Sequence, residues 1–138
     1  MVNAFQFRPA FPNRNWDFYN GELNNPGPED NFFEAALSLP DHIKITKMVV
    51  YFYDNGEKDL VVGLWRFDPS TGTWLAMAEV ASSDAQDEYR NVTDTSILEA
   101  AVDQQEYSYV IEVGIPPAYD MLRLAAVRID YTIKGDQQ

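Results

Sequence analysis

The chain has no cysteine among its 138 residues. Without cysteine a protein has no disulfide, no thiol nucleophile and no thiolate ligand for a metal. The absence excludes the enzymes and metalloproteins that depend on these groups. It leaves the cellular compartment open, because secreted bacterial proteins often lack cysteine as well.

Positive charge is scarce. The chain has 10 Lys and Arg residues against 22 Asp and Glu, which gives a net charge of −12. Nucleic-acid binding needs a basic stripe, and anionic membranes attract basic segments. We therefore expect neither nucleic acid nor a membrane as a partner, and the acidity favours solubility.

Long apolar runs and catalytic motifs are missing too. No window approaches the roughly 18 apolar residues of a membrane span, and no signal-peptide pattern stands at the start. Gly-x-Ser-x-Gly, His-Glu-x-x-His and a glycine-rich phosphate loop are absent. The one histidine, His42, follows Pro40-Asp41, which predicts a surface turn. These absences predict a protein that is not an enzyme and needs no cofactor.

Two acidic stretches are candidate metal loops. Residues 54–59 are rich in oxygen ligands but lack the spacing of a calcium-binding EF-hand. The second stretch contains Asp84, Asp87 and Glu88, which predict a solvated loop. We expect a metal at neither stretch.

What the sequence has is β pattern. β-Branched and aromatic residues alternate over residues 43–53 and end at Asp54-Asn55-Gly56, a strong hairpin signal. Similar segments predict further strands at residues 32–39, 60–67, 73–81, 89–92, 107–115 and 122–133. A short helix is predicted at residues 96–102, with Thr95 as its N-cap. The spacing of strands and turns predicts an all-β domain over residues 32–138, an antiparallel β-sandwich of jelly-roll type.

Residues 1–31 differ from this pattern. They combine aromatic residues with Pro9, Pro12, Pro26 and Pro28, and prolines interrupt long regular elements. We expect an extended N-terminal arm with one or two short edge strands. The arm docks either on its own domain or on a neighbouring subunit.

Alternation assigns side chains to faces. In the strand at 107–115, the odd-numbered residues from Tyr107 to Ile115 share an apolar face. In the last strand, alternation groups Leu122, Leu124 and Ala126 with Arg128 on one face.

The strands at 60–67 and 73–81 predict a hairpin that pairs Phe67 with Trp74, Trp65 with Ala76 and Gly63 with Ala78. Both faces of this hairpin are apolar, so an entirely solvated face is not expected. Either the aromatic face is core, or Leu60, Val62 and Leu64 face the core. In the second case Trp65, Phe67 and Trp74 form an exposed patch, which is a subunit interface or a platform for stacking sugars.

The order of short motifs resembles that of bacterial single-domain β-sandwich proteins of unknown function, many of them secreted. The motifs are residues 7–9 (Phe-Arg-Pro), 39–41 (Leu-Pro-Asp), 51–55 (Tyr-Phe-Tyr-Asp-Asn), 93–94, 102–103, 107–109, 122–124 and 127–131. The resemblance spans nearly the whole chain. It implies that Leu60, Val62 and Leu64 point inward and that the tryptophan patch is exposed. It also implies secretion, if a signal peptide has been removed.

The leading hypothesis is a non-enzymatic structural protein that forms a homo-oligomer, as the subunit of a multimer, shell or fibre. The alternative is a carbohydrate-binding module with a polysaccharide as partner. The candidate interface or ligand patch is the same in both: Trp65, Phe67 and Trp74, joined by Trp16 of the arm.

Overall fold

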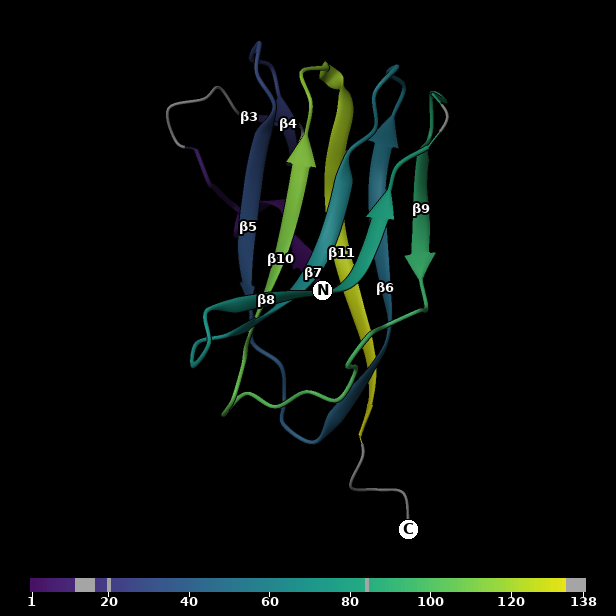
Figure 1. Cartoon of the computed structure of the whole chain (residues 1–138). Helices are drawn as coiled ribbons and strands as arrows, with labels where there is room; N and C mark the ends of the chain where they lie inside the picture. The colour runs from purple at the N-terminus through teal and green to yellow at the C-terminus, as the bar shows by residue number, and fades with distance from the viewer. Residues whose placement is uncertain (12–16, 20, 84, 134–138) are drawn as a thin grey trace.

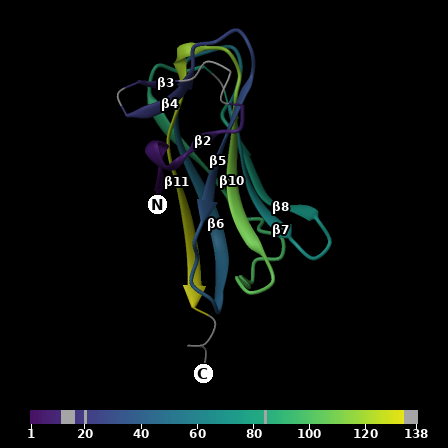
Figure 2. The same cartoon turned by 90° about the vertical axis from the view of Figure 1, so that its left-hand side faces the viewer.

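A computed structural model describes residues 1–11, 17–19, 21–83 and 85–133. Two antiparallel β-sheets pack face to face, which confirms the predicted all-β sandwich (Figures 1 and 2). No helix in the described residues is long and apolar enough to cross a membrane.

Sheet A has the strand order β3-β4-β11-β6-β9, with β1 also paired to β11. Its strands are β1 (Val2–Asn3), β3 (Asp17–Tyr19), β4 (Glu22–Asn25), β6 (Ile43–Asp54), β9 (Tyr89–Asp94) and β11 (Tyr119–Ile133). Sheet B has the order β2-β5-β10-β7-β8. Its strands are β2 (Arg8–Pro9), β5 (Asn31–Leu37), β7 (Val61–Asp68), β8 (Thr73–Ala81) and β10 (Ser108–Ile115).

The chain crosses repeatedly between the two sheets. Strands β4, β6, β9 and β11 lie in sheet A, and strands β5, β7, β8 and β10 lie in sheet B. Four strands of each sheet, interleaved in this way, form the jelly-roll arrangement that the sequence predicts.

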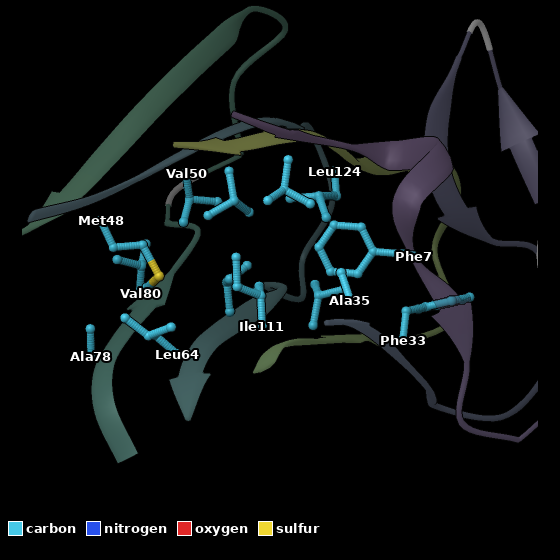
Figure 3. Close-up of a cluster of buried hydrophobic side chains, with 14 of the residues drawn as sticks. Phe7, Phe33, Ala35, Met48, Val50, Leu64, Ala78, Val80, Ile111 and Leu124 are labelled. Carbon is cyan, nitrogen blue, oxygen red and sulfur yellow. The ribbon is translucent and has the colours of Figure 1, made fainter. Parts of the chain in front are cut away.

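The core fills the space between the sheets (Figure 3). Strand β10 shows the predicted alternation, since Tyr109, Ile111, Val113 and Ile115 are all buried. They form one cluster with buried residues of both sheets, among them Phe33 and Leu64 of sheet B and Val50 and Leu124 of sheet A. Burying this apolar area is the main term that stabilises the fold.

The described part of residues 1–31 lies on its own chain. In β1, Val2 pairs with Val127 of sheet A, and in β2, Arg8 pairs with Glu34 of sheet B. Between them Phe7 is fully buried in the core. A short 3-10 helix, η1 (Ala4–Gln6), links the two strands. The segment therefore joins both sheets of one molecule.

The hairpin expected at Asn55-Gly56 is wrong, because β6 lies in sheet A and β7 lies in sheet B. The connection is held by the buried carboxylate of Asp54. It accepts hydrogen bonds from the Gly56 backbone N (3.1 Å) and the Ser82 hydroxyl (2.7 Å). The Asn-Gly pair therefore lies in the loop that connects β6 of sheet A to β7 of sheet B.

The helix expected at residues 96–102 is also wrong. The backbone of this segment pairs with β6 instead, through Ile45 N to Ala100 O (2.9 Å) and Val102 N to Ile43 O (3.0 Å). A helix of under two turns has little stability of its own, so these pairings with an existing strand prevail.

Register shifts interrupt several strand pairs, and two β-bulges among them overturn the pairing and the faces predicted from alternation. In β8, Leu64 pairs with Ala78 but Trp65 pairs with Ala76, so Met77 is the extra residue. The predicted pairing of Gly63 with Ala78 is therefore wrong, and Gly63 pairs with Glu79. In β11, the register shifts between Leu124 and Ala126.

As a result of the second bulge, Leu122, Leu124 and Val127 are buried while Ala126 and Arg128 are not. The single face predicted for Leu122, Leu124 and Ala126 is wrong beyond Leu124. A bulge inserts one residue into the alternation and exchanges the two faces after it.

Candidate functional site

The β7–β8 hairpin leaves the body of the sandwich and projects from sheet B (Figures 1 and 2). Its turn is closed by Asp68, whose backbone carbonyl accepts from Gly72 N (2.8 Å) and whose carboxylate accepts from Ser70 N (2.9 Å). The hydrogen bonds from Ser70 lower the pKa of Asp68. Gly72 has a φ of +71°, which glycine adopts without a steric penalty.

The inner face of the hairpin is aliphatic. Leu60, Val62 and Leu64 are fully buried, so the aromatic residues of the hairpin do not form its core-facing side. Trp65 and Phe67 are half-buried and Trp74 is 54% exposed on the outer face. The rings of Phe67 and Trp74 pack on each other with centroids 4.6 Å apart.

A hollow of about 370 Å³ lies on the outer face of sheet B. We call it the tryptophan hollow; its lining residues are Glu34, Trp65, Trp74, Val110 and Glu112. They come from four strands, β5, β7, β8 and β10, which are neighbours in the sheet. Cross-strand pairing fixes their positions, because Val110 stands opposite Trp65 and Glu112 opposite Glu34.

Gly63 determines how the Trp65 side chain lies. A Cβ atom at Gly63 would stand 2.6 Å from Trp65 Nε1, closer than real side chains approach. The indole therefore occupies the space over the Gly63 backbone and lies along the sheet. A glycine at an outward strand position gives an aromatic ring room to lie against the backbone.

Several polar groups around this indole have no partner among the described residues. Within the described part of the chain, the carboxylates of Glu34 and Glu112 take part in no hydrogen bond or ion pair, and the indole N–H groups of Trp65 and Trp74 donate none. Burial, followed by repulsion from Glu34, raises the pKa of Glu112. The hollow thus combines apolar ring surface with unused donors and acceptors.

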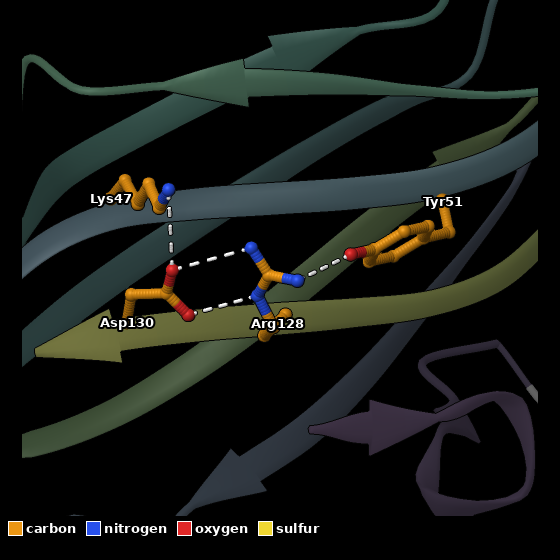
Figure 4. Close-up of polar contacts among 4 residues, drawn as sticks. All are labelled: Lys47, Tyr51, Arg128 and Asp130. Carbon is orange, nitrogen blue, oxygen red and sulfur yellow. Dashed lines mark hydrogen bonds and ion pairs between the residues drawn. The ribbon is translucent and has the colours of Figure 1, made fainter.

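The outer face of sheet A is different, because its rings and charges are paired with each other (Figure 4). Arg128 donates to Asp130 (2.9 and 3.3 Å) and to the Tyr51 hydroxyl (2.7 Å). Lys47 lies 3.5 Å from the same Asp130 carboxylate. Such a closed network offers few free groups to a ligand.

A second network on sheet A is more deeply buried. Arg123 and Glu22 form an ion pair at 2.9 Å with both side chains about nine-tenths buried. Tyr89 donates to the same carboxylate oxygen (2.9 Å), and the guanidinium of Arg123 lies 4.1 Å from the ring centroid of Tyr53. Tyr53 in turn donates to Asp87. These contacts tie β4, β6, β9 and β11 together.

Of the residues that the sequence singles out, the structure brings Trp65, Phe67 and Trp74 together on one face. Trp16 lies outside the described residues. Glu34, Val110 and Glu112 were not found from the sequence, since their strands meet the hairpin only in the folded sheet. Alternation within each strand marks them as outward residues but does not show which strand lies beside which.

Other candidates stand apart from this hollow. His42 is exposed in a turn with a φ of 61°, as a surface turn residue should be. Among the described residues, no group of three or more His, Asp or Glu side chains is arranged to hold a metal ion.

No family model matches the sequence, and no curated protein matches it. Solved structures do match the fold. One is TmCBM61 in complex with β-1,4-galactotriose, with a TM-score of 0.52 and 14% identity over 95% of this chain and 92% of that one. Another is described as "CBM4 structure and function", with a TM-score of 0.54 and 13% identity over 93% of this chain and 96% of that one. Both are β-sandwich carbohydrate-binding modules, and at these identities the likeness extends to the fold alone.

Proposed function

We propose that the protein is a non-catalytic binding module that holds a carbohydrate in the tryptophan hollow of sheet B. The observation that carries the proposal is the hollow itself, where two indole rings stand beside carboxylates that have no partner in the described chain.

The chemistry of a sugar ring suits this arrangement. One face of a pyranose presents C–H groups of slightly positive charge, and an aromatic face is slightly negative, so the two stack. The hydroxyl groups at the sugar's rim donate to carboxylates and accept from an indole N–H. Trp65 and Trp74 supply the rings, and Glu34 and Glu112 supply acceptors.

The fold comparisons support the same reading. The jelly-roll sandwich is shared with two carbohydrate-binding modules, one of them holding a β-1,4-linked galactotriose. This makes β-1,4-galactan a reasonable first probe for the present chain, together with a panel of other neutral polysaccharides.

The test is a calorimetric titration of the protein with these polysaccharides, with tryptophan fluorescence as a second readout. We expect Trp65→Ala and Trp74→Ala each to weaken binding by about tenfold, because a well-stacked ring contributes about 1 kcal/mol or more. Tyr131→Ala is the matched control, since it removes an exposed aromatic ring from sheet A. Equal affinity in the tryptophan variants and the control would contradict the proposal.

Assembly as a homo-oligomer, the leading hypothesis from the sequence, uses the same aromatic face but has no support from the fold comparisons. Light scattering behind a sizing column separates the two. A carbohydrate-binding monomer keeps a mass near 15.8 kDa at every protein concentration, and its fluorescence responds to polysaccharide. A multimer that Trp65→Ser and Trp74→Ser dissociate would favour assembly.

A further inference from the structure

A second hollow lies on the same outer face of sheet B. It has a volume of about 210 Å³ and is lined on the sheet by Phe32, Val61 and Gly114. The acids Asp30 and Asp59 stand beside it. We call it the phenylalanine hollow. Phe32 is 37% exposed and Val61 is 40% exposed.

Strand pairing places the two hollows in neighbouring rows. Phe32, Gly114 and Val61 stand opposite one another across β5, β10 and β7. The next outward row across the same strands is Glu34, Glu112 and Gly63. The row after that contains Val110 and Trp65. The tryptophan hollow begins where the phenylalanine hollow ends, and the two glutamates stand in the row between Phe32 and Trp65.

The phenylalanine hollow repeats the construction of the first. A Cβ atom at Gly114 would meet the Phe32 ring at 3.0 Å, just as one at Gly63 would meet Trp65. In both places a glycine on one strand gives an aromatic ring room to lie against the sheet. Phe11 supports the Phe32 ring from the side, with the centroids 6.1 Å apart in an edge-to-face arrangement.

The Cα atoms of Phe32 and Trp65 are two rows apart along the strands, about 13 Å, and two strand spacings apart, about 10 Å. The two side chains lean towards each other, because the indole lies over Gly63 and the phenyl ring lies over Gly114. These glycines are one row, about 7 Å, and one strand spacing, about 5 Å, apart. A single pyranose stacks on one of the rings, whereas a chain of several sugars reaches both.

The surface along this line is acidic. Glu34 and Glu112 lie in the row between Phe32 and Trp65, and Asp30 and Asp59 line the phenylalanine hollow. Arg8, which stands opposite Glu34 in β2, directs its guanidinium to the backbone carbonyls of Phe5 and Phe7, each at 3.2 Å. Repulsion along this line disfavours a ligand that carries carboxylates or sulfates.

We propose that sheet B binds a linear, uncharged glycan of several sugars along one line, with one stacking site at Trp65 and a second at Phe32. This inference rests on the proposed function and adds the ligand's length, its charge and a second contact. Affinity then depends on chain length, because a monosaccharide stacks on one ring alone.

The experiment is a calorimetric series from monosaccharide to hexasaccharide, cut from the neutral polysaccharide that the protein binds best. The wild type and the variants Phe32→Ala and Trp65→Ala are compared. We expect wild-type affinity to rise with length. Phe32→Ala should lower the affinity for the longest saccharide by about tenfold and leave the shortest unchanged. Trp65→Ala should weaken every length.

The outcomes separate the two proposals. If no neutral saccharide binds the wild type, the proposed function fails and this inference fails with it. If saccharides bind and Trp65→Ala weakens them, but Phe32→Ala has the same effect at every length or none, the function stands and the second site is refuted. Tight binding of a uronate-rich polysaccharide would overturn the charge selection.

Loss of the fold must be distinguished from loss of the site. Phe32→Leu keeps an apolar side chain on the sheet but removes the ring, and its melting temperature should stay close to that of the wild type. The length dependence should be lost in this variant as well. A Phe32→Leu protein that folds and still favours long saccharides as the wild type does would refute the second site.

Discussion

Gly63 shows how a residue without a side chain can shape a surface. The Trp65 indole occupies the space where a Cβ would stand, 2.6 Å from Nε1. We expect Gly63→Ala to displace the indole and to weaken polysaccharide binding although both tryptophans are still present. Calorimetry measures the effect, and the near-ultraviolet circular dichroism reports the moved ring. The matched control is Gly56→Ala, where the added Cβ would make an ordinary contact with Met121 at 3.8 Å. Unchanged binding in Gly63→Ala would show that the position of the indole does not matter.

Glu112 makes the folding stability depend on pH. Burial and the neighbouring Glu34 raise its pKa in the folded protein, so the folded state binds this proton more tightly than the unfolded state does. Stability from this group therefore increases as the pH falls from neutral through the raised pKa, and the increase is complete below the ordinary carboxyl pKa of about 4.3.

Glu112→Gln removes this titration. We expect the variant to melt at a higher temperature than the wild type at pH 7 and the difference to shrink as the pH approaches about 4. Thermal melts across that range measure it. Glu79→Gln removes an exposed acid opposite Gly63 and controls for net charge. A Glu112→Gln profile parallel to that of the wild type would refute the role of this carboxylate.

At the scale of elements, the Arg123–Glu22 pair holds the short strand β4 to β11. Both side chains are buried, so Arg123→Met leaves a buried carboxylate with Tyr89 as its remaining partner. Breaking such a pair from one side costs about 3–5 kcal/mol of unfolding free energy. We expect that loss in Arg123→Met and a substantial recovery in the double variant Glu22→Gln/Arg123→Met.

Denaturant unfolding measures these free energies. Lys47→Met is the control, because it breaks an ion pair in which the lysine is 41% exposed. An exposed pair contributes about 0–1 kcal/mol. If the double variant were less stable than Arg123→Met, the buried carboxylate would not be the cause of the loss.

The strand elements could be predicted because each is a local run of β-branched and aromatic residues. The segment 73–81 was expected as a strand and is β8, Thr73–Ala81. The two bulges could not be predicted from alternation. The extra residue of the β8 bulge, Met77, is stabilised by burial of its side chain and by a hydrogen bond from Leu98 N to its backbone carbonyl (3.0 Å). The burial of Met77 and this hydrogen bond both depend on contacts with other parts of the folded chain. Alternation within β8 therefore could not predict which of its side chains face the core.

At the scale of the whole molecule, the sequence predicted the sandwich but not the neighbours of each strand. Asn55-Gly56 is a strong local turn signal, yet β6 pairs with β11 and β9 and the chain leaves for the other sheet. The candidate site shows the same limit. Trp65 and Trp74 are close in the hairpin and were found together, whereas Glu34 and Glu112 reach the hollow from β5 and β10.

The pairing of the first strands with the last has a consequence for how the molecule is made. Val2 pairs with Val127, Leu23 with Leu124, and Asn31 with Ile115. In a chain emerging from the ribosome, β1 has no strand partner and β4 and β5 each have one unpaired edge until β10 and β11 have been synthesised. Contacts this distant in sequence also make folding slow. The newborn chain therefore exposes these strand edges until β10 and β11 follow, and its two sheets close only then.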